Sequence, residues 1–134
     1  MKKIILILRL VAAAILFQTL YFKFTGAPES KFIFSTLGLE PWGRLGSGVG
    51  ELVASVLLLL PQTQLIGALM ALGIISGAIL SHIFVLGIVV QGDGGLLFAL
   101  ALTVFACASG ILLLQFKDIV KLAEASKRWL MRKR

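Results

Sequence analysis

Two ionisable residues lie inside long apolar stretches of this chain, where lipid makes a polar side chain costly. Glu51 falls in the apolar run 45–60, and His82 falls in the run 65–90. Ionisable residues within membrane-spanning segments are rare, usually face the interior of a helix bundle, and mark functional sites. A carboxylate and an imidazole can also take protons from a ligand or give protons to it. We therefore predict a polar, proton-handling site built around these two residues.

The composition indicates that the apolar stretches cross a membrane. Of the 134 residues, 59% are hydrophobic and only 14% are charged, and the mean hydropathy is +1.04. Four stretches are long enough, or nearly so, for the ~20 residues that a helix needs to cross the hydrocarbon core. The sequence predicts an all-α integral membrane bundle in a single domain, 1–134, with transmembrane helices at about 4–23, 42–60, 65–90 and 96–116.

Two further helices are expected outside the hydrocarbon core. Pro28 suits the first turn of a helix and Gly38 suits its end. The residues between them are apolar, which predicts a short interfacial helix on the outer surface. The basic tail 117–134 has apolar and charged residues on different faces of a helix, which predicts a basic amphipathic helix on the cytoplasmic surface. A disordered, solvated tail is the alternative.

The distribution of charge predicts the orientation of the chain. The net charge is +7, and the basic residues concentrate at both ends. Since Lys-rich and Arg-rich segments stay on the cytoplasmic side, both termini are expected in the cytoplasm, with the connections 24–43 and 91–95 outside. Beside membrane spans, the basic tail favours anionic lipid as a partner rather than nucleic acid. The lipid bilayer itself is the main partner that the sequence predicts.

Three more polar residues are expected close to Glu51 and His82. At the helical rise, those two lie roughly 10 and 12 Å below the outer surface. Lys23 ends the first helix on that side, Asp93 lies in the outer turn, and Gln18 lies deeper and needs a hydrogen-bond partner from another helix. We predict a ligand-binding site formed by these five residues. A hydrogen-bond network that only fixes helix register is the alternative.

Small and basic residues lead to further expectations about packing. Arg9 is shallow enough in the first helix for its side chain to extend to the cytoplasmic headgroups. Gly46 and Gly50 form a G-x-x-x-G pair, and Gly73 and Gly77 form a small-residue face on the third predicted helix. Both patterns predict close approach of neighbouring helices.

The cysteine and histidine content limits the chemistry. Cys107 is the only cysteine, so a disulfide within the chain or a C-x-x-C redox pair is excluded. Its apolar surroundings indicate a packing residue. With a single histidine, a dedicated zinc or iron site is not expected, and no metal ligand is assigned.

Three short motifs occur along the membrane portion of the chain: Tyr21-Phe22-Lys23-Phe24-Thr25-Gly26, Gly50-Glu51-Leu52 before an apolar run to Pro61, and a small-residue helix that ends at His82. Together they resemble the DoxX-like family of small bacterial membrane proteins, over Ile4 to about Leu114. Lys23 matches the family's lysine after the first helix, and Glu51 matches its acidic residue in the second. The resemblance implies a four-helix bundle in the bacterial inner membrane. It also implies, for some relatives, a link to oxidative stress or to redox complexes with quinone as acceptor.

Three functions of different classes follow as hypotheses. The first is an accessory subunit of a quinone-linked redox or oxidative-stress system, with the quinone bound near Glu51 and His82. The sequence has no flavin, haem or thiol motif, so a soluble or membrane redox partner would supply the electrons. The second is a proton-linked small-molecule carrier, which at this size would form a homo-oligomer. The third is a structural or assembly subunit. The sequence predicts no particular reaction and does not establish an enzyme.

Overall fold

The computed structural model describes residues 2–134, and all regular secondary structure in this range is helical. The prediction of an all-α chain is therefore confirmed. The elements are α1 (Lys2–Thr25), α2 (Pro28–Thr36), α3 (Trp42–Leu59), α4 (Gln64–Ser81), the short π-helix η1 (His82–Leu86), α5 (Leu96–Leu114) and α6 (Phe116–Arg132).

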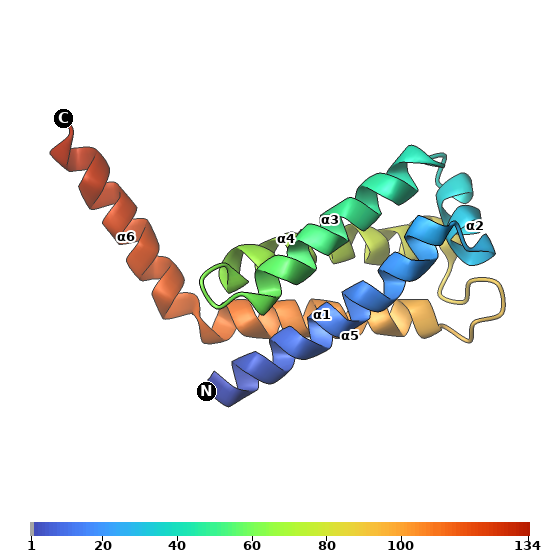
Figure 1. Ribbon diagram of the computed structural model, residues 1–134, viewed down its shortest axis with the longest axis horizontal. Coiled ribbons are helices and arrows are strands. Elements are labelled where there is room, and N and C mark those ends of the chain that lie inside the picture. Colours follow the sequence, from blue (N-terminus) through green and yellow to red (C-terminus); the bar gives the residue numbers. More distant parts are fainter. Residues whose placement is uncertain (1) are drawn as a thin grey trace.

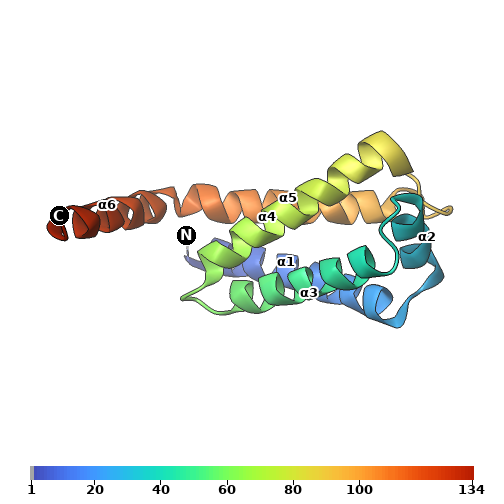
Figure 2. The same cartoon turned by 90° about the horizontal axis from the view of Figure 1, so that it is seen from above.

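The long helices α1, α3, α4 and α5 form an antiparallel bundle. Both α1 and α4 pack against α3 and α5, which closes the bundle. At one end lie α2 and the loop 87–95, and at the other lie the start of α1 and the turn after α3 (Figure 1, Figure 2). At this second end α6 leaves the bundle and extends away from it (Figure 1), and none of its residues is buried.

Three helical segments are long and apolar enough to cross a membrane: α1, the continuous α4 and η1, and α5. The 18-residue helix α3 is not among them, because Arg44 and Glu51 reduce its hydropathy. The outer surface of the bundle is also apolar, and the side chains of Trp42 and Phe84 are 79% and 78% exposed. Large exposed apolar surfaces are unfavourable in water. Both features fit a membrane protein.

Small side chains make up much of the core. Ala12, Ala54, Ala68 and Ala108 are fully buried between the four long helices. Small residues at helix interfaces let the backbones approach closely, which favours packing in lipid, where the hydrophobic effect does not drive helix association.

Helix α4 approaches α3 closely at Gly67. A Cβ atom there would lie 2.6 Å from the backbone nitrogen of Leu58 and 2.9 Å from the carbonyl carbon of Leu57. The prediction of close approach at both Gly46 and Gly50 is wrong for Gly46, where a Cβ would meet nothing within 4 Å. At Gly50 it would meet only the end of a flexible isoleucine side chain.

The predicted third helix, 65–90, is wrong at its C-terminal end. Regular α-helix ends at Ser81, and η1 ends at Leu86, because Gly87 has a φ of +80° that favours glycine. An irregular loop follows to Gly95. The other three predicted membrane helices agree with α1, α3 and α5 to within two residues at each end, and the short helix at Pro28 and the helix in the tail are both present.

Arg9 does not extend to the membrane surface as predicted. Its side chain is buried, with Nε donating to the carbonyl of Leu58 at 2.6 Å and Nη2 donating to that of Leu59 at 2.8 Å. Carbonyls at a helix C-terminus lack partners within the helix and carry partial negative charge. Arg9 therefore ties α1 to the end of α3.

Candidate functional site

A cavity of about 790 Å³ lies at the end of the bundle where α2 packs. Most of its lining is apolar, and its size is typical of small-molecule sites. The structure brings all five predicted site residues to this one cavity. Its ionisable and polar lining residues are Gln18, Thr19, Lys23, Glu29, Ser30, Ser47, Glu51, Ser81, His82, Gln91 and Asp93.

The cavity exists partly because α4 presents glycines toward it. Gly73 and Gly77 both line it, and a Cβ atom at either position would meet nothing within 4 Å. The prediction that this small-residue face packs closely against another helix is therefore wrong. On the side of α2, the lining includes the apolar residues Ile33, Phe34 and Leu37.

Glu51 forms a buried ion pair on one wall of the cavity. Its side chain is 5% exposed, and its Oε1 lies 2.5 Å from Nζ of Lys23. Its Oε2 accepts a hydrogen bond from Oγ1 of Thr19 at 2.9 Å. Lys23 and Thr19 lie four residues apart on α1, so they share the face that packs against α3. Thr19 was not predicted as a site residue, although its spacing from Lys23 provides a signal.

A second basic residue holds the end of α1 in place. Arg44 is buried near the start of α3, and its Nη1 donates to the carbonyl of Lys23. Its Nε lies 2.9 and 3.0 Å from the two carboxylate oxygens of Glu40. This contact fixes the backbone that carries the Lys23 side chain. Arg44 was not predicted as a site residue. Its i,i+4 spacing from Glu40, which favours an ion pair, is the only local feature that points to it.

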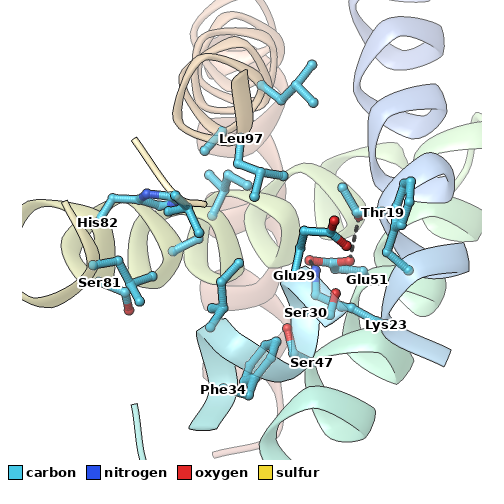
Figure 3. A pocket seen from close by; sticks show the side chains of 18 of the residues that line it. Thr19, Lys23, Glu29, Ser30, Phe34, Ser47, Glu51, Ser81, His82 and Leu97 are labelled. Carbon is cyan, nitrogen blue, oxygen red and sulfur yellow. Dashed lines mark hydrogen bonds and ion pairs between the residues drawn. The ribbon is translucent and has the colours of Figure 1, made fainter. Parts of the chain in front are cut away.

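His82 lies across the cavity from the ion pair. Figure 3 shows Lys23, Glu29 and Glu51 on one side, with Ser81 and His82 on the other. The imidazole is buried where α4 passes into η1, and its ring centroid lies 5.6 Å from that of Phe98. His82 makes no ion pair with Glu51 among the described residues, and both side chains line the same cavity. Single π-helical turns of this kind are frequent at functional sites.

His82 and Gly87 form two hydrogen bonds in the π-turn, one between their backbones and one from the imidazole. The backbone N–H of Gly87 donates to the carbonyl of His82 at 2.8 Å. In the other direction, Nδ1 of His82 lies 3.0 Å from the carbonyl oxygen of Gly87. The ring orientation is therefore set by the turn that ends the helix.

Asp93 lines the cavity, but its carboxylate mainly orders the loop before α5. One oxygen accepts from the backbone N–H groups of Val90 and Gly95 at 3.0 and 2.8 Å, and the other accepts from that of Leu97 at 3.2 Å. Desolvation raises the pKa of Asp93, but these hydrogen bonds and the nearby His82 outweigh it, so its pKa lies below the ordinary 3.8. The loop beside His82 is thus held by an ionised carboxylate.

Gln18 lies at the cavity without the partner that the sequence predicted for it. Gln18 lines the cavity but is exposed, and it makes no hydrogen bond to another helix within residues 2–134. The interhelical bond predicted for Gln18 is instead made by its neighbour Thr19.

Cys107 is buried in the bundle core. Over the described range, no group of three or more potential metal-ligating side chains occurs.

The fold and the cavity define a class of protein, a small helical bundle with three segments able to cross a membrane and a ligand-sized space at one end. In comparisons with known proteins, the chain matches no family model, and no curated protein or solved structure is significantly similar to it. The resemblance to the DoxX-like family therefore stays a prediction from short motifs.

Proposed function

We propose that the chain is an inner-membrane protein that binds a quinone-class molecule in this cavity, as an accessory subunit of a quinone-linked redox or oxidative-stress system. One observation carries the proposal: a mostly apolar cavity has an ion-paired carboxylate on one wall and an imidazole on the other. A quinone has an apolar ring and tail, with polar oxygens at opposite ends of the ring. A site with separated polar groups in apolar surroundings suits such a molecule.

The proposal gives separate roles to the groups on the two walls. Glu51 relays a proton, and the ammonium group of Lys23 stabilises its carboxylate form. His82 hydrogen-bonds an oxygen of the ligand. Reduction of a quinone takes two electrons and two protons, and in this proposal a partner redox protein supplies the electrons. The chain supplies the binding site and a proton path.

The proposed topology has four crossings, with α3 as the fourth. Its packing against α1 and α4 along the bundle supports this, since both are apolar enough to cross a membrane. The end of the bundle that carries α2 and the cavity then faces outward. The DoxX-like motifs and the basic ends of the chain support placement in a bacterial inner membrane with cytoplasmic termini.

In this topology α6 lies on the cytoplasmic leaflet. Its large apolar side chains Leu122, Trp129 and Leu130 are all more than half exposed. A basic amphipathic helix in that state suits the boundary between headgroups and acyl chains. Anionic lipid would interact with the basic side chains of the tail. These are Lys117, Lys121, Lys127, Arg128, Arg132, Lys133 and Arg134.

Titration of the purified protein in nanodiscs with a short-chain benzoquinone tests the proposal. Saturable binding is expected, and Glu51→Gln is expected to weaken it by about tenfold, the effect of losing one charged hydrogen-bonding group. Glu124→Gln is the matched control, because Glu124 lies on α6 outside the cavity with its side chain 60% exposed. Absence of binding by the wild-type protein, or equal binding by Glu51→Gln, would contradict the proposal.

A structural role is the second candidate, because both oxygens of Glu51 already have partners within the bundle. A double substitution, Glu51→Gln with His82→Gln, separates the two roles. A purely structural role predicts lower thermal stability with the cellular phenotype unchanged. A ligand-binding role predicts loss of quinone binding in protein that is still folded.

A further inference from the structure

The turn at η1 determines which nitrogen of His82 carries a proton. The carbonyl oxygen of Gly87 can only accept a hydrogen bond, and it lies 3.0 Å from Nδ1. Nδ1 must therefore be the donor. In a neutral imidazole one ring nitrogen donates and the other accepts. It follows that Nε2 of neutral His82 carries a lone pair and no hydrogen.

Nε2 is a free acceptor that the His82 side chain offers to the site. It has no hydrogen-bond partner within residues 2–134, yet it is not sealed from the cavity, which His82 lines. His82 as a whole residue is 5% exposed, so bulk water reaches it poorly. Leaving a buried acceptor unpaired costs free energy that a donor on a ligand recovers.

The surroundings keep the ring in this orientation. A flip of the imidazole would break the bond from Nδ1 to Gly87, whose φ of +80° and ψ of 170° favour glycine. Phe98 of α5 lies against the ring at a centroid distance of 5.6 Å. The loop that follows is ordered by Asp93 through backbone hydrogen bonds. The direction in which Nε2 presents its lone pair is therefore built into the fold.

We infer that the cavity selects the hydroxyl-bearing, hydroquinone form of its ligand over the quinone form, because His82 offers an acceptor to a ligand hydroxyl. The inference rests on the proposed function and names the redox state that the site holds. A hydroquinone hydroxyl donates to Nε2, whereas a quinone carbonyl has only lone pairs and leaves Nε2 unpaired. On the opposite wall, Lys23 keeps N–H groups that either form can use. The carboxylate of Glu29 also lines the cavity (Figure 3) without a hydrogen bond or ion pair among residues 2–134, so substitution of His82 is needed to isolate the contribution of Nε2.

Three probes of nearly the same shape test the inference: a short-chain hydroquinone, its dimethyl ether and the parent quinone. Equilibrium dialysis is performed under argon at pH 8.5. The hydroquinone is expected to bind about tenfold more tightly than either other probe, which corresponds to one hydrogen bond to a buried acceptor. His82→Phe retains a ring against Phe98 but has no acceptor, so the ratio should fall severalfold.

Ser76→Ala is the control for the variant. Ser76 lies on α4 outside the cavity lining, and its hydroxyl donates to the carbonyl of Leu72. It should retain the tenfold preference. If His82→Phe does not fold, the comparison of the three probes on the wild-type protein still tests whether the cavity prefers the hydroquinone form.

The outcomes separate the inference from the proposed function. Equal or tighter binding of the quinone or the dimethyl ether by the wild-type protein would overturn the inference but leave the quinone-class site in place. Retention of the preference in folded His82→Phe would overturn the role given to His82. Absence of binding for all three probes would overturn the proposed function and the inference together.

Discussion

Replacement of Lys23 by methionine is expected to destabilise the bundle strongly, because it leaves a buried carboxylate without its counter-ion. The Glu51 side chain is 5% exposed and lies 2.5 Å from Nζ of Lys23. Methionine retains most of the apolar length of lysine, so the substitution removes the charge with little change in packing. A lone buried charge is far more costly than a buried pair.

The magnitude follows from the surroundings of the pair. Removing one partner of a buried ion pair costs about 3–5 kcal/mol. The Lys23 side chain is 15% exposed, and Thr19 continues to donate to Oε2 of Glu51, so the lower end of that range applies. We expect Lys23→Met to lower the free energy of unfolding by about 3 kcal/mol. Replacing both partners, with Lys23→Met and Glu51→Gln together, should bring the stability back to within about 1 kcal/mol of wild type.

The assay is reversible unfolding in mixed micelles with increasing sodium dodecyl sulfate, followed by circular dichroism. Lys31→Met on α2 is the matched control, since Lys31 is exposed and forms no ion pair among residues 2–134. Its effect should stay within about 0.5 kcal/mol. Equal stabilities of Lys23→Met and Lys31→Met would refute the buried ion pair. A double variant as unstable as the sum of the two single variants would refute the coupling between Lys23 and Glu51.

Three further predictions concern the scaffold around the site. Arg9→Met removes two charged hydrogen bonds to the end of α3. In the same assay it should lower the free energy of unfolding by about 2–3 kcal/mol. A decrease below about 0.5 kcal/mol, the size expected for an exposed substitution, would contradict the contact. Gly67→Ala places a methyl group 2.6 Å from a backbone nitrogen of α3 and should cost about 1–3 kcal/mol. Gly73→Ala, with open space at its Cβ, should be neutral or stabilising by up to about 1 kcal/mol. If Gly73→Ala were less stable than Gly67→Ala, the packing described for the two glycines would be wrong. Because the pKa of Asp93 is lowered in the folded protein, its contribution to stability is complete above the ordinary pKa of 3.8 and is lost as pH falls through the folded value. The difference in melting temperature between wild type and Asp93→Asn should therefore shrink below about pH 4, and a difference independent of pH would exclude this role.

The positions of most helices could be predicted from the sequence, because they depend on local features. Apolar runs of sufficient length, Pro28 at the start of α2 and the basic tail of α6 are all visible without tertiary contacts. The end of the third predicted helix could not be located, since the apolar residues continue to Val90 with no polar residue after His82. What ends the helix is the backbone conformation of Gly87, and hydropathy does not reveal it.

The site could be predicted in part for the same reason. Charge-derived topology and helical rise were sufficient to bring Lys23, Glu51 and His82 to one end of the bundle, where all three line the cavity. The partners of individual groups were not predictable, because they come from packing between distant segments. Arg9 donates to a carbonyl 49 positions away. Its shallow position in the first helix predicted contact with headgroups and did not reveal this partner.

Glycines illustrate the same limit. Gly67 lies against the backbone of a neighbouring helix, whereas Gly73 and Gly77 on the same helix face a cavity. The sequence pattern of small residues is alike in both places. Whether a glycine brings helices together or leaves a space between them depends on the neighbouring element, here α3 for Gly67.

The claim that the cavity beside α2 holds a quinone-class ligand is tested most directly by filling the cavity. Gly77→Phe projects a ring into open space on the cavity wall, and Gly46→Phe projects the same ring into open space outside its lining. Binding of the short-chain benzoquinone in nanodiscs is measured for both folded variants. We predict that Gly77→Phe weakens binding strongly while Gly46→Phe binds like the wild-type protein. Unchanged binding by folded Gly77→Phe would contradict the claim.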